Sequence, residues 1–251
     1  MNFYKHCIAM VALLLFSIGA THSQAQEASE KSDIDPVATA ILKRMSDFIG
    51  KTKQFTVTTE NTLEYLLDSG HRIDIDVLAN VIVSRPNNLR AERRGKLVDQ
   101  IFYYNGNVLT LYHPETNLYA TESVPENYLE LFRYMANTLG FAVPVSDLIL
   151  EGSYSLLMED VTLAAYLGRS NINGVLCDQL LFSRPGVDFQ VWVAVGDQPF
   201  PYKYVVTDTS APDRMSIRTT MRDWNFTPEL KKTEFTFTPP DGAHKIEFLP
   251  F

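Results

Sequence analysis

The feature that most constrains this chain is an alternation of apolar and polar side chains over residues 55–83. Along residues 55–67 the odd-numbered positions are largely apolar, whereas the even-numbered positions carry mostly threonine and glutamate. After a turn at 68–71 the alternation continues over 73–83. Successive side chains of a β-strand point to opposite faces, so this repeat predicts an antiparallel sheet with one face in water. The other face is apolar and must be covered by another part of the chain.

Short turns punctuate the rest of the chain. The dipeptide Asn105-Gly106 is the strongest hairpin sequence, and a turn is also expected at 85–88. Consecutive strands joined by such short turns are antiparallel neighbours. The sequence predicts strands at 55–67, 73–83, 89–94, 97–104, 108–112 and 118–123, then further strands from about 163, including 187–195, 215–222 and 234–238.

Helical patterns occur at two places. Asp35 and Pro36 are a good cap and first residue for a helix that ends before Gly50. A helical insert at about 125–160 contains a helix expected at 125–139, a short one starting at Ser146 and a third at 153–160. A sheet of about ten strands curls or closes. We therefore predict an α+β fold, a strongly curved antiparallel half-open β-barrel with helices covering its concave side.

Two interpretations of the concave side stay open at this stage. Either the helices leave a cavity that holds an apolar ligand, or their side chains fill the space completely. If a cavity exists, its walls should come from the apolar faces of the strands and of the helix at 125–139. The candidate wall residues are Val57, Leu63, Tyr65, Ile75, Val77, Val81, Phe102, Leu109, Leu111, Phe132 and Met135.

The N-terminus has the order of a cleavable signal peptide. Lys5 precedes an apolar stretch at 7–16, and Ser23 and Ala25 place small residues at the −3 and −1 positions of a cleavage site. The apolar stretch is shorter than the roughly 20 residues of a membrane span. We expect cleavage near Ala25, a periplasmic mature chain without a transmembrane segment, a flexible tether at 26–33, and a single domain at 34–251.

Composition narrows the classes of partner. The chain carries 22 basic and 30 acidic residues, a net charge of −8, and loss of Lys5 with the signal makes it −9. Because phosphate binding needs a basic face, nucleic acid is not expected as a partner. Cys177 would be the only cysteine left after cleavage, and its strand-like surroundings predict a buried small hydrophobe.

Catalytic and metal chemistry are not indicated. His71, His113 and His244 lie in turns or beside Pro or Gly, without ligand partners at metal spacing. No Gly-x-Ser-x-Gly motif is present, and the acidic pairs Asp74/Asp76 and Glu159-Asp160 are typical of solvated positions. We therefore expect no catalytic residues, no metal, no cofactor and no enzymatic activity.

A basic run at Arg90, Arg93, Arg94 and Lys96 has two interpretations. It is either a patch that meets an anionic headgroup or an acidic partner, or a charged strand that protects a sheet edge from aggregation. The pattern slightly favours edge protection.

Two segments resemble a known group of proteins. Residues 83–90 (VSRPNNLR) and 102–114 (FYYNGNVLTLYHP) are similar to the core of LolA/LolB-type lipoprotein localisation factors. The tail, with Asp223-Trp224-Asn225 and residues 235–246 (FTFTPPDGAHKI), resembles a bacterial family of predicted periplasmic proteins of unassigned function. The resemblance covers most of the mature chain. It implies a LolA-like domain at 34–251, carriage of lipid or lipoprotein acyl chains, and envelope membrane proteins as loading partners.

These observations lead to two functional hypotheses. The first is a periplasmic carrier or chaperone that binds a lipid or the acyl chains of an acylated protein between the sheet and the helices. The alternative is a non-catalytic envelope module with a filled core that binds other proteins through its surface.

Overall fold

The computed structural model describes residues 33–141, 143 and 145–248. The signal peptide and the tether, apart from Asp33, lie outside these ranges, so the cleavage near Ala25 and the tether stay predictions. The described residues form one compact unit. None of the helices in the described ranges combines the length and hydrophobicity that crossing a membrane requires.

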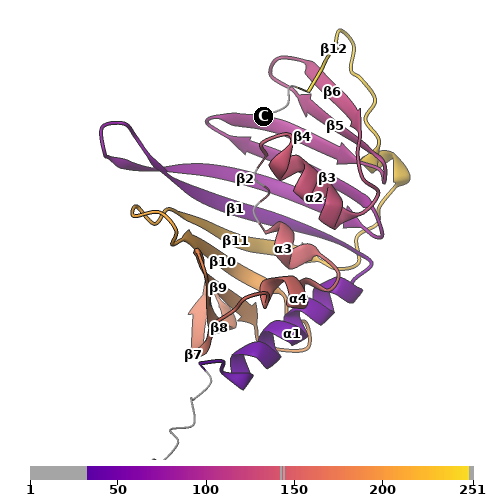
Figure 1. Ribbon diagram of the computed structural model, residues 1–251. Coiled ribbons are helices and arrows are strands. Elements are labelled where there is room, and N and C mark those ends of the chain that lie inside the picture. The colour runs from indigo at the N-terminus through magenta and orange to yellow at the C-terminus, as the bar shows by residue number, and fades with distance from the viewer. Residues whose placement is uncertain (1–32, 142, 144, 249–251) are drawn as a thin grey trace, which may run out of the picture. The chain divides into compact units, whose positions relative to one another are not determined.

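The strands of the described ranges form one sheet of 12, in the order β12-β6-β5-β4-β3-β2-β1-β11-β10-β9-β8-β7 (Figure 1). In chain order they are β1 (Gln54–Leu66), β2 (Arg72–Ser84), β3 (Asn88–Gly95), β4 (Val98–Tyr104), β5 (Val108–His113), β6 (Leu118–Ser123), β7 (Leu163–Ile172), β8 (Val175–Arg184), β9 (Val187–Ala194), β10 (Pro201–Asp208), β11 (Ser216–Asn225) and β12 (His244–Ile246). The sheet is curved (Figure 1). It is also open, because the strands at its two ends, β12 and β7, do not pair with each other. This confirms the predicted fold class, with two more strands than expected.

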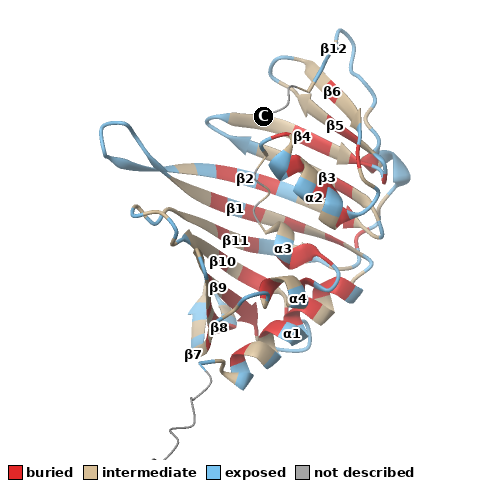
Figure 2. Cartoon of the chain, viewed as in Figure 1, coloured by how far each residue is buried: buried red, intermediate tan, exposed pale blue. Residues whose placement is uncertain are grey.

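The alternation read from the sequence sets the two faces of the sheet. Phe55, Val57 and Thr59 of β1 are buried, whereas Glu60 between the inward positions is exposed (Figure 2). All 13 residues of β1 pair with β2 in unbroken antiparallel register. Because the repeat is two, that register places the inward side chains of both strands on the same face.

Four α-helices of the described ranges, α1 (Pro36–Lys51), α2 (Tyr128–Asn137), α3 (Ser146–Ile149) and α4 (Ser153–Leu157), lie over one face of the sheet (Figure 1). The Asp35 carboxylate accepts a hydrogen bond from the Val37 amide at 2.8 Å, so the expected cap of α1 is confirmed. Helix α2 starts three residues later than predicted, because the Asn127 side chain caps it by accepting from the Glu130 amide at 2.9 Å. One hydrophobic core joins α1, the insert and the sheet.

The expected strand at 234–238 is wrong. A 3-10 helix, η1 (Lys232–Phe235), occupies its start, and the last strand is β12, which runs parallel to β6. Phe235 is buried, whereas Phe237 packs its ring 5.0–5.4 Å from three tyrosine rings on β4, β5 and β6. Phe235 and Phe237 are apolar residues two positions apart, which matches the pattern of a strand. The preceding strand in the chain is β11, and both of its edges are already paired, with β1 and β10.

Cys177 is fully buried on β8, as predicted. Burial raises the pKa of its thiol to about 11. Because the thiolate is the reactive form, we expect the folded protein at pH 8 to resist alkylation by iodoacetamide and to react fully in denaturant. Mass spectrometry of the alkylated protein measures this. Rapid labelling of the native protein would contradict the burial of this residue.

Candidate ligand cavity

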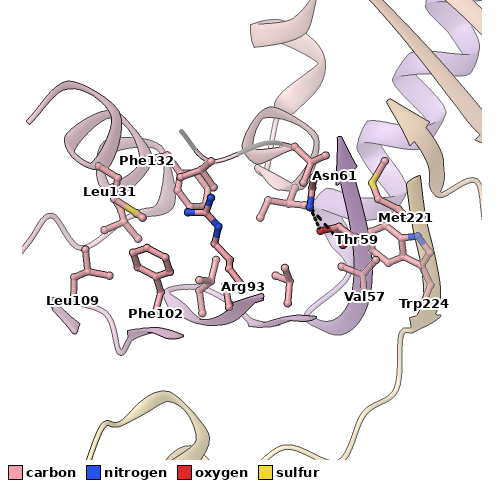
Figure 3. Close-up of a pocket in the computed structure, with 17 residues that line it drawn as sticks. Val57, Thr59, Asn61, Arg93, Phe102, Leu109, Leu131, Phe132, Met221 and Trp224 are labelled. Atoms are coloured by element: carbon pink, nitrogen blue, oxygen red, sulfur yellow. Dashed lines mark hydrogen bonds between the residues drawn. The ribbon is translucent and has the colours of Figure 1, made fainter. Parts of the chain in front are cut away.

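A cavity of about 70 Å³ lies between the sheet and the helical insert (Figure 3). Three of its 17 lining residues, Thr59, Asn61 and Arg93, are polar or charged, and the others are apolar. The lining consists of Val57, Thr59, Asn61, Val81, Leu89, Ala91, Arg93, Phe102, Leu109, Leu131, Phe132, Met135, Val143, Val145, Ile149, Met221 and Trp224.

Strand register assembles the floor of the cavity. Val57 on β1 is opposite Val81 on β2, which is opposite Ala91 on β3, and Ala91 is opposite Phe102 on β4. Side chains opposite each other on neighbouring antiparallel strands share a face. Four residues spread over 46 positions of sequence therefore form one apolar row across the curved sheet.

Helix α2 forms the opposite wall. Leu131, Phe132 and Met135 are buried on its inner face, at the spacing of one helical turn. The Tyr128 hydroxyl fixes the helix by donating to the carbonyls of Asn88 at 2.8 Å and Ser84 at 3.2 Å. Desolvation in this position raises the pKa of the Tyr128 phenol, so it stays a donor.

Six of the eleven candidate wall residues line this cavity: Val57, Val81, Phe102, Leu109, Phe132 and Met135. The other five, Leu63, Tyr65, Ile75, Val77 and Leu111, lie outside its lining. The β1–β2 hairpin projects beyond the helices, and its far end is exposed (Figure 2). Tyr65, for example, is 54% exposed. Alternation identifies the inward face of a strand but not where a helix stops covering it. Whether the six residues contact a ligand stays a prediction.

The candidate wall residues do not include the polar part of the lining. Thr59 and Asn61 lie on the inward face of β1, at odd-numbered positions of the alternation, and Met221 and Trp224 of β11 complete this side of the cavity. Thr219 donates from its hydroxyl to the Asn61 Oδ1 at 2.8 Å, and the Asn61 Nδ2 donates to the Thr59 Oγ1 at 2.9 Å. The same nitrogen also donates to the Val77 carbonyl at 3.1 Å. This buried network satisfies the amide and presents Thr59 beside the cavity.

The basic run separates into two faces. Strand β3 lies between β2 and β4, so the interpretation as an edge-protecting strand is wrong. Arg90 and Arg94 both pair with Glu92 on the outer face. Arg93 instead faces inward and lines the cavity, with its guanidinium carbon 6.0 Å from the centre of the Phe102 ring. Burial lowers the pKa of Arg93 from its ordinary value.

Metal-binding groups do not gather in the part of the chain that the structure describes, where no three His, Cys, Asp or Glu side chains could hold one ion. His71 is exposed at the end of the β1–β2 hairpin, His113 ends β5, and His244 begins β12. The lining of the cavity presents apolar contacts, hydrogen-bond donors and one cation, Arg93.

Several solved structures are similar to this chain at low sequence identity. An uncharacterized conserved protein from Thermus thermophilus is 12% identical, with 84% of this chain and 99% of that chain covered and a TM-score of 0.50. The Mycobacterium tuberculosis lipoprotein LppX is 15% identical over 78% of this chain and 100% of its own, with a TM-score of 0.46. A LolA superfamily protein from Nitrosomonas europaea is 13% identical over 80% and 97%, with a TM-score of 0.36.

A search of curated proteins gives no match. A family model described as "Predicted periplasmic protein (DUF2092)" matches residues 38–249. That span includes the sheet, the helical insert and the cavity lining. It agrees with the family resemblance and with the periplasmic location expected from the N-terminus. The chain belongs to the DUF2092 family of predicted periplasmic proteins.

Proposed function

We propose that the protein is a periplasmic carrier or chaperone that binds the acyl chain of a lipid or lipoprotein in the cavity under α2. The observation that carries this proposal is the apolar lining of the cavity between the curved sheet and the insert. Transfer of a hydrocarbon chain out of water contributes about 0.8 kcal/mol for each buried CH₂ group. A chain of ordinary lipid length could therefore bind without a specific polar contact.

The size of the cavity indicates how such a ligand would enter. Small-molecule pockets have volumes of about 300–1,000 Å³, so 70 Å³ corresponds to a closed state. Binding then requires α2 to move away from the sheet, and the ligand chain to replace the contacts of Leu131, Phe132 and Met135. An exchange of apolar contacts of similar area keeps the free-energy cost of opening low, which suits a protein that must also release its ligand.

This function needs binding and release but no reaction, so we propose that the protein is not an enzyme. Loading and unloading would involve membrane proteins of the envelope as partners. The alternative, a non-catalytic interaction module with a filled core, is favoured by the small volume of the cavity. The two functions differ in one measurable property, because only a carrier acquires an acyl ligand.

Native mass spectrometry and lipid extraction of protein purified from the periplasm test the proposal. We expect co-purifying amphiphile, or saturable binding of a hexadecanoyl fluorescent probe by protein stripped of lipid. Competition by unlabelled hexadecanoate should displace the probe. A ligand-free preparation that also fails to bind the probe would exclude the carrier function and favour the interaction module.

A further inference from the structure

Arg93 is a half-buried cation that lines a largely apolar cavity. In Figure 3 its side chain extends from β3 between Phe102 and Phe132 on one side and Val57 and Thr59 on the other. Its neighbours in sequence behave differently, since Arg94 has 67% of its side chain exposed and pairs with Glu92 and Asp99. Among the described residues, Arg93 has no carboxylate within ion-pair distance, and its contact is the cation–π approach to Phe102.

Placing an unpaired charge in this position has a cost in free energy. A half-buried charge loses part of its hydration, and an ion pair normally compensates for that loss. The cation–π contact with Phe102 offsets only part of this cost. An arginine also keeps its charge when buried, since its pKa stays far above neutral. The cavity therefore holds a permanent positive charge that lacks a counter-ion in the described part of the protein.

A second donor lies near this charge. Arg93 is opposite Ala79, and Ala79 is opposite Thr59, so the two polar residues are separated by one strand with only a methyl group between them. Two strand spacings amount to about 10 Å between their backbones, which an arginine side chain and a threonine can span with a small anion between them. The Thr59 Oγ1 accepts from Asn61, which leaves its own proton to donate.

We propose that the cavity selects amphiphiles with an anionic headgroup, a carboxylate or a phosphate, which Arg93 binds through its guanidinium with help from the Thr59 hydroxyl. This inference rests on the proposed carrier function and specifies its ligand class. The planar guanidinium matches a carboxylate or phosphate with two parallel hydrogen bonds. The outer-face arginines carry no such role, because Arg90 pairs with Glu92, and Arg94 pairs with Glu92 and Asp99.

Binding of hexadecanoate, monohexadecyl phosphate and methyl hexadecanoate to the stripped full-length mature protein tests this selectivity. The three probes share a chain and differ in headgroup. A hydrogen bond to a charged group contributes about 1.5–3 kcal/mol, so both anionic probes should bind roughly 10- to 100-fold more tightly than the ester. Acetate and inorganic phosphate, which lack the chain, should not compete at the same concentrations.

Arg93→Gln should abolish the preference for the anionic probes, so that acid, phosphate and ester bind with similar affinity. Arg93→Lys should keep part of the preference, since lysine retains the charge but lacks the planar guanidinium that donates two parallel hydrogen bonds. Arg94→Gln is the matched control, one residue away on the outer face, and should retain the full preference. Equal affinities for ester and acid in the unmodified protein, or an unchanged preference in Arg93→Gln, would overturn the inference while leaving the carrier function intact. Failure of all three probes to bind would instead remove the carrier function.

Stability of the ligand-free protein provides an independent measurement. Arg93→Met replaces the charge by an unbranched apolar side chain, so we expect the thermal midpoint to rise by roughly 2–4 °C. The gain arises because the unliganded protein no longer holds an unpaired charge in a half-buried position. A clear fall in the midpoint would mean that Arg93 is a structural element of the fold, and would also overturn the inference.

Discussion

Ala91→Leu is expected to weaken binding of an acyl probe by roughly 100-fold without unfolding the protein. Ala91 lies on the floor of the cavity, opposite Phe102 in the register of β3 and β4. The three added carbon atoms would occupy space in a cavity of about 70 Å³ and exclude the ligand chain. One methylene in an apolar pocket already changes affinity about 10- to 200-fold. Fluorescence titration with a hexadecanoyl probe measures the effect.

The same substitution at Ala165 is the control. Ala165 is a half-buried residue of β7 outside the cavity lining, so Ala165→Leu should bind the probe like the unmodified protein. Circular dichroism should show the same β content for both variants. Undiminished binding in Ala91→Leu would mean that acyl chains do not enter this cavity, and the ligand site would have to be sought elsewhere.

Arg85→Ala is expected to lower the free energy of unfolding by about 3 kcal/mol. The half-buried guanidinium donates to the carbonyls of Thr52 at 3.0 Å, Ile49 at 3.2 Å and Ile149 at 2.5 Å. It therefore joins the C-terminal end of α1 to α3, and its charge stabilises the carbonyl end of the α1 dipole. Removing it leaves three carbonyl groups without their donor. Urea unfolding followed by tryptophan fluorescence measures the loss.

Arg133→Ala is the matched comparison. Arg133 is an exposed residue of α2 that pairs with Glu130, and an ion pair of this kind contributes about 0–1 kcal/mol. Arg85→Lys should lose an intermediate amount, because one ammonium group keeps the charge but cannot reach all three carbonyls. A loss for Arg85→Ala no larger than that for Arg133→Ala would show that the three contacts contribute little to stability.

Local patterns in the sequence were sufficient for most of the sheet and for the N-terminal cap of α1. The repeat of two in β1 and β2 depends only on the geometry of an extended chain, and the Asp35 cap depends on residues within one turn of it. The buried state of Cys177 also followed from its immediate neighbours. These features are decided by contacts close in sequence, so they could be predicted without knowing the fold.

The sequence predictions that differ from the structure have another cause in common. The segment at 234–238 has a strand pattern, but no free strand edge beside β11 was available to it. Leu63 and Ile75 have the inward orientation that was predicted, yet they lie beyond the cavity because the hairpin extends past the helices. In both cases the position of distant elements, and not the local pattern alone, decided the outcome.

Arg93 shows most clearly which features follow from the sequence and which depend on the tertiary structure. The sequence by itself determined an exported chain of one-sided strands with amphipathic helices, because alternation, caps and turns are properties of neighbouring residues. Only the tertiary structure decided that β3 is an interior strand, that one of its arginines faces α2, and that no carboxylate of the described residues meets it. The depth and charge of a site depend on which distant segments approach it, and that is fixed by packing of the whole sheet and its helices.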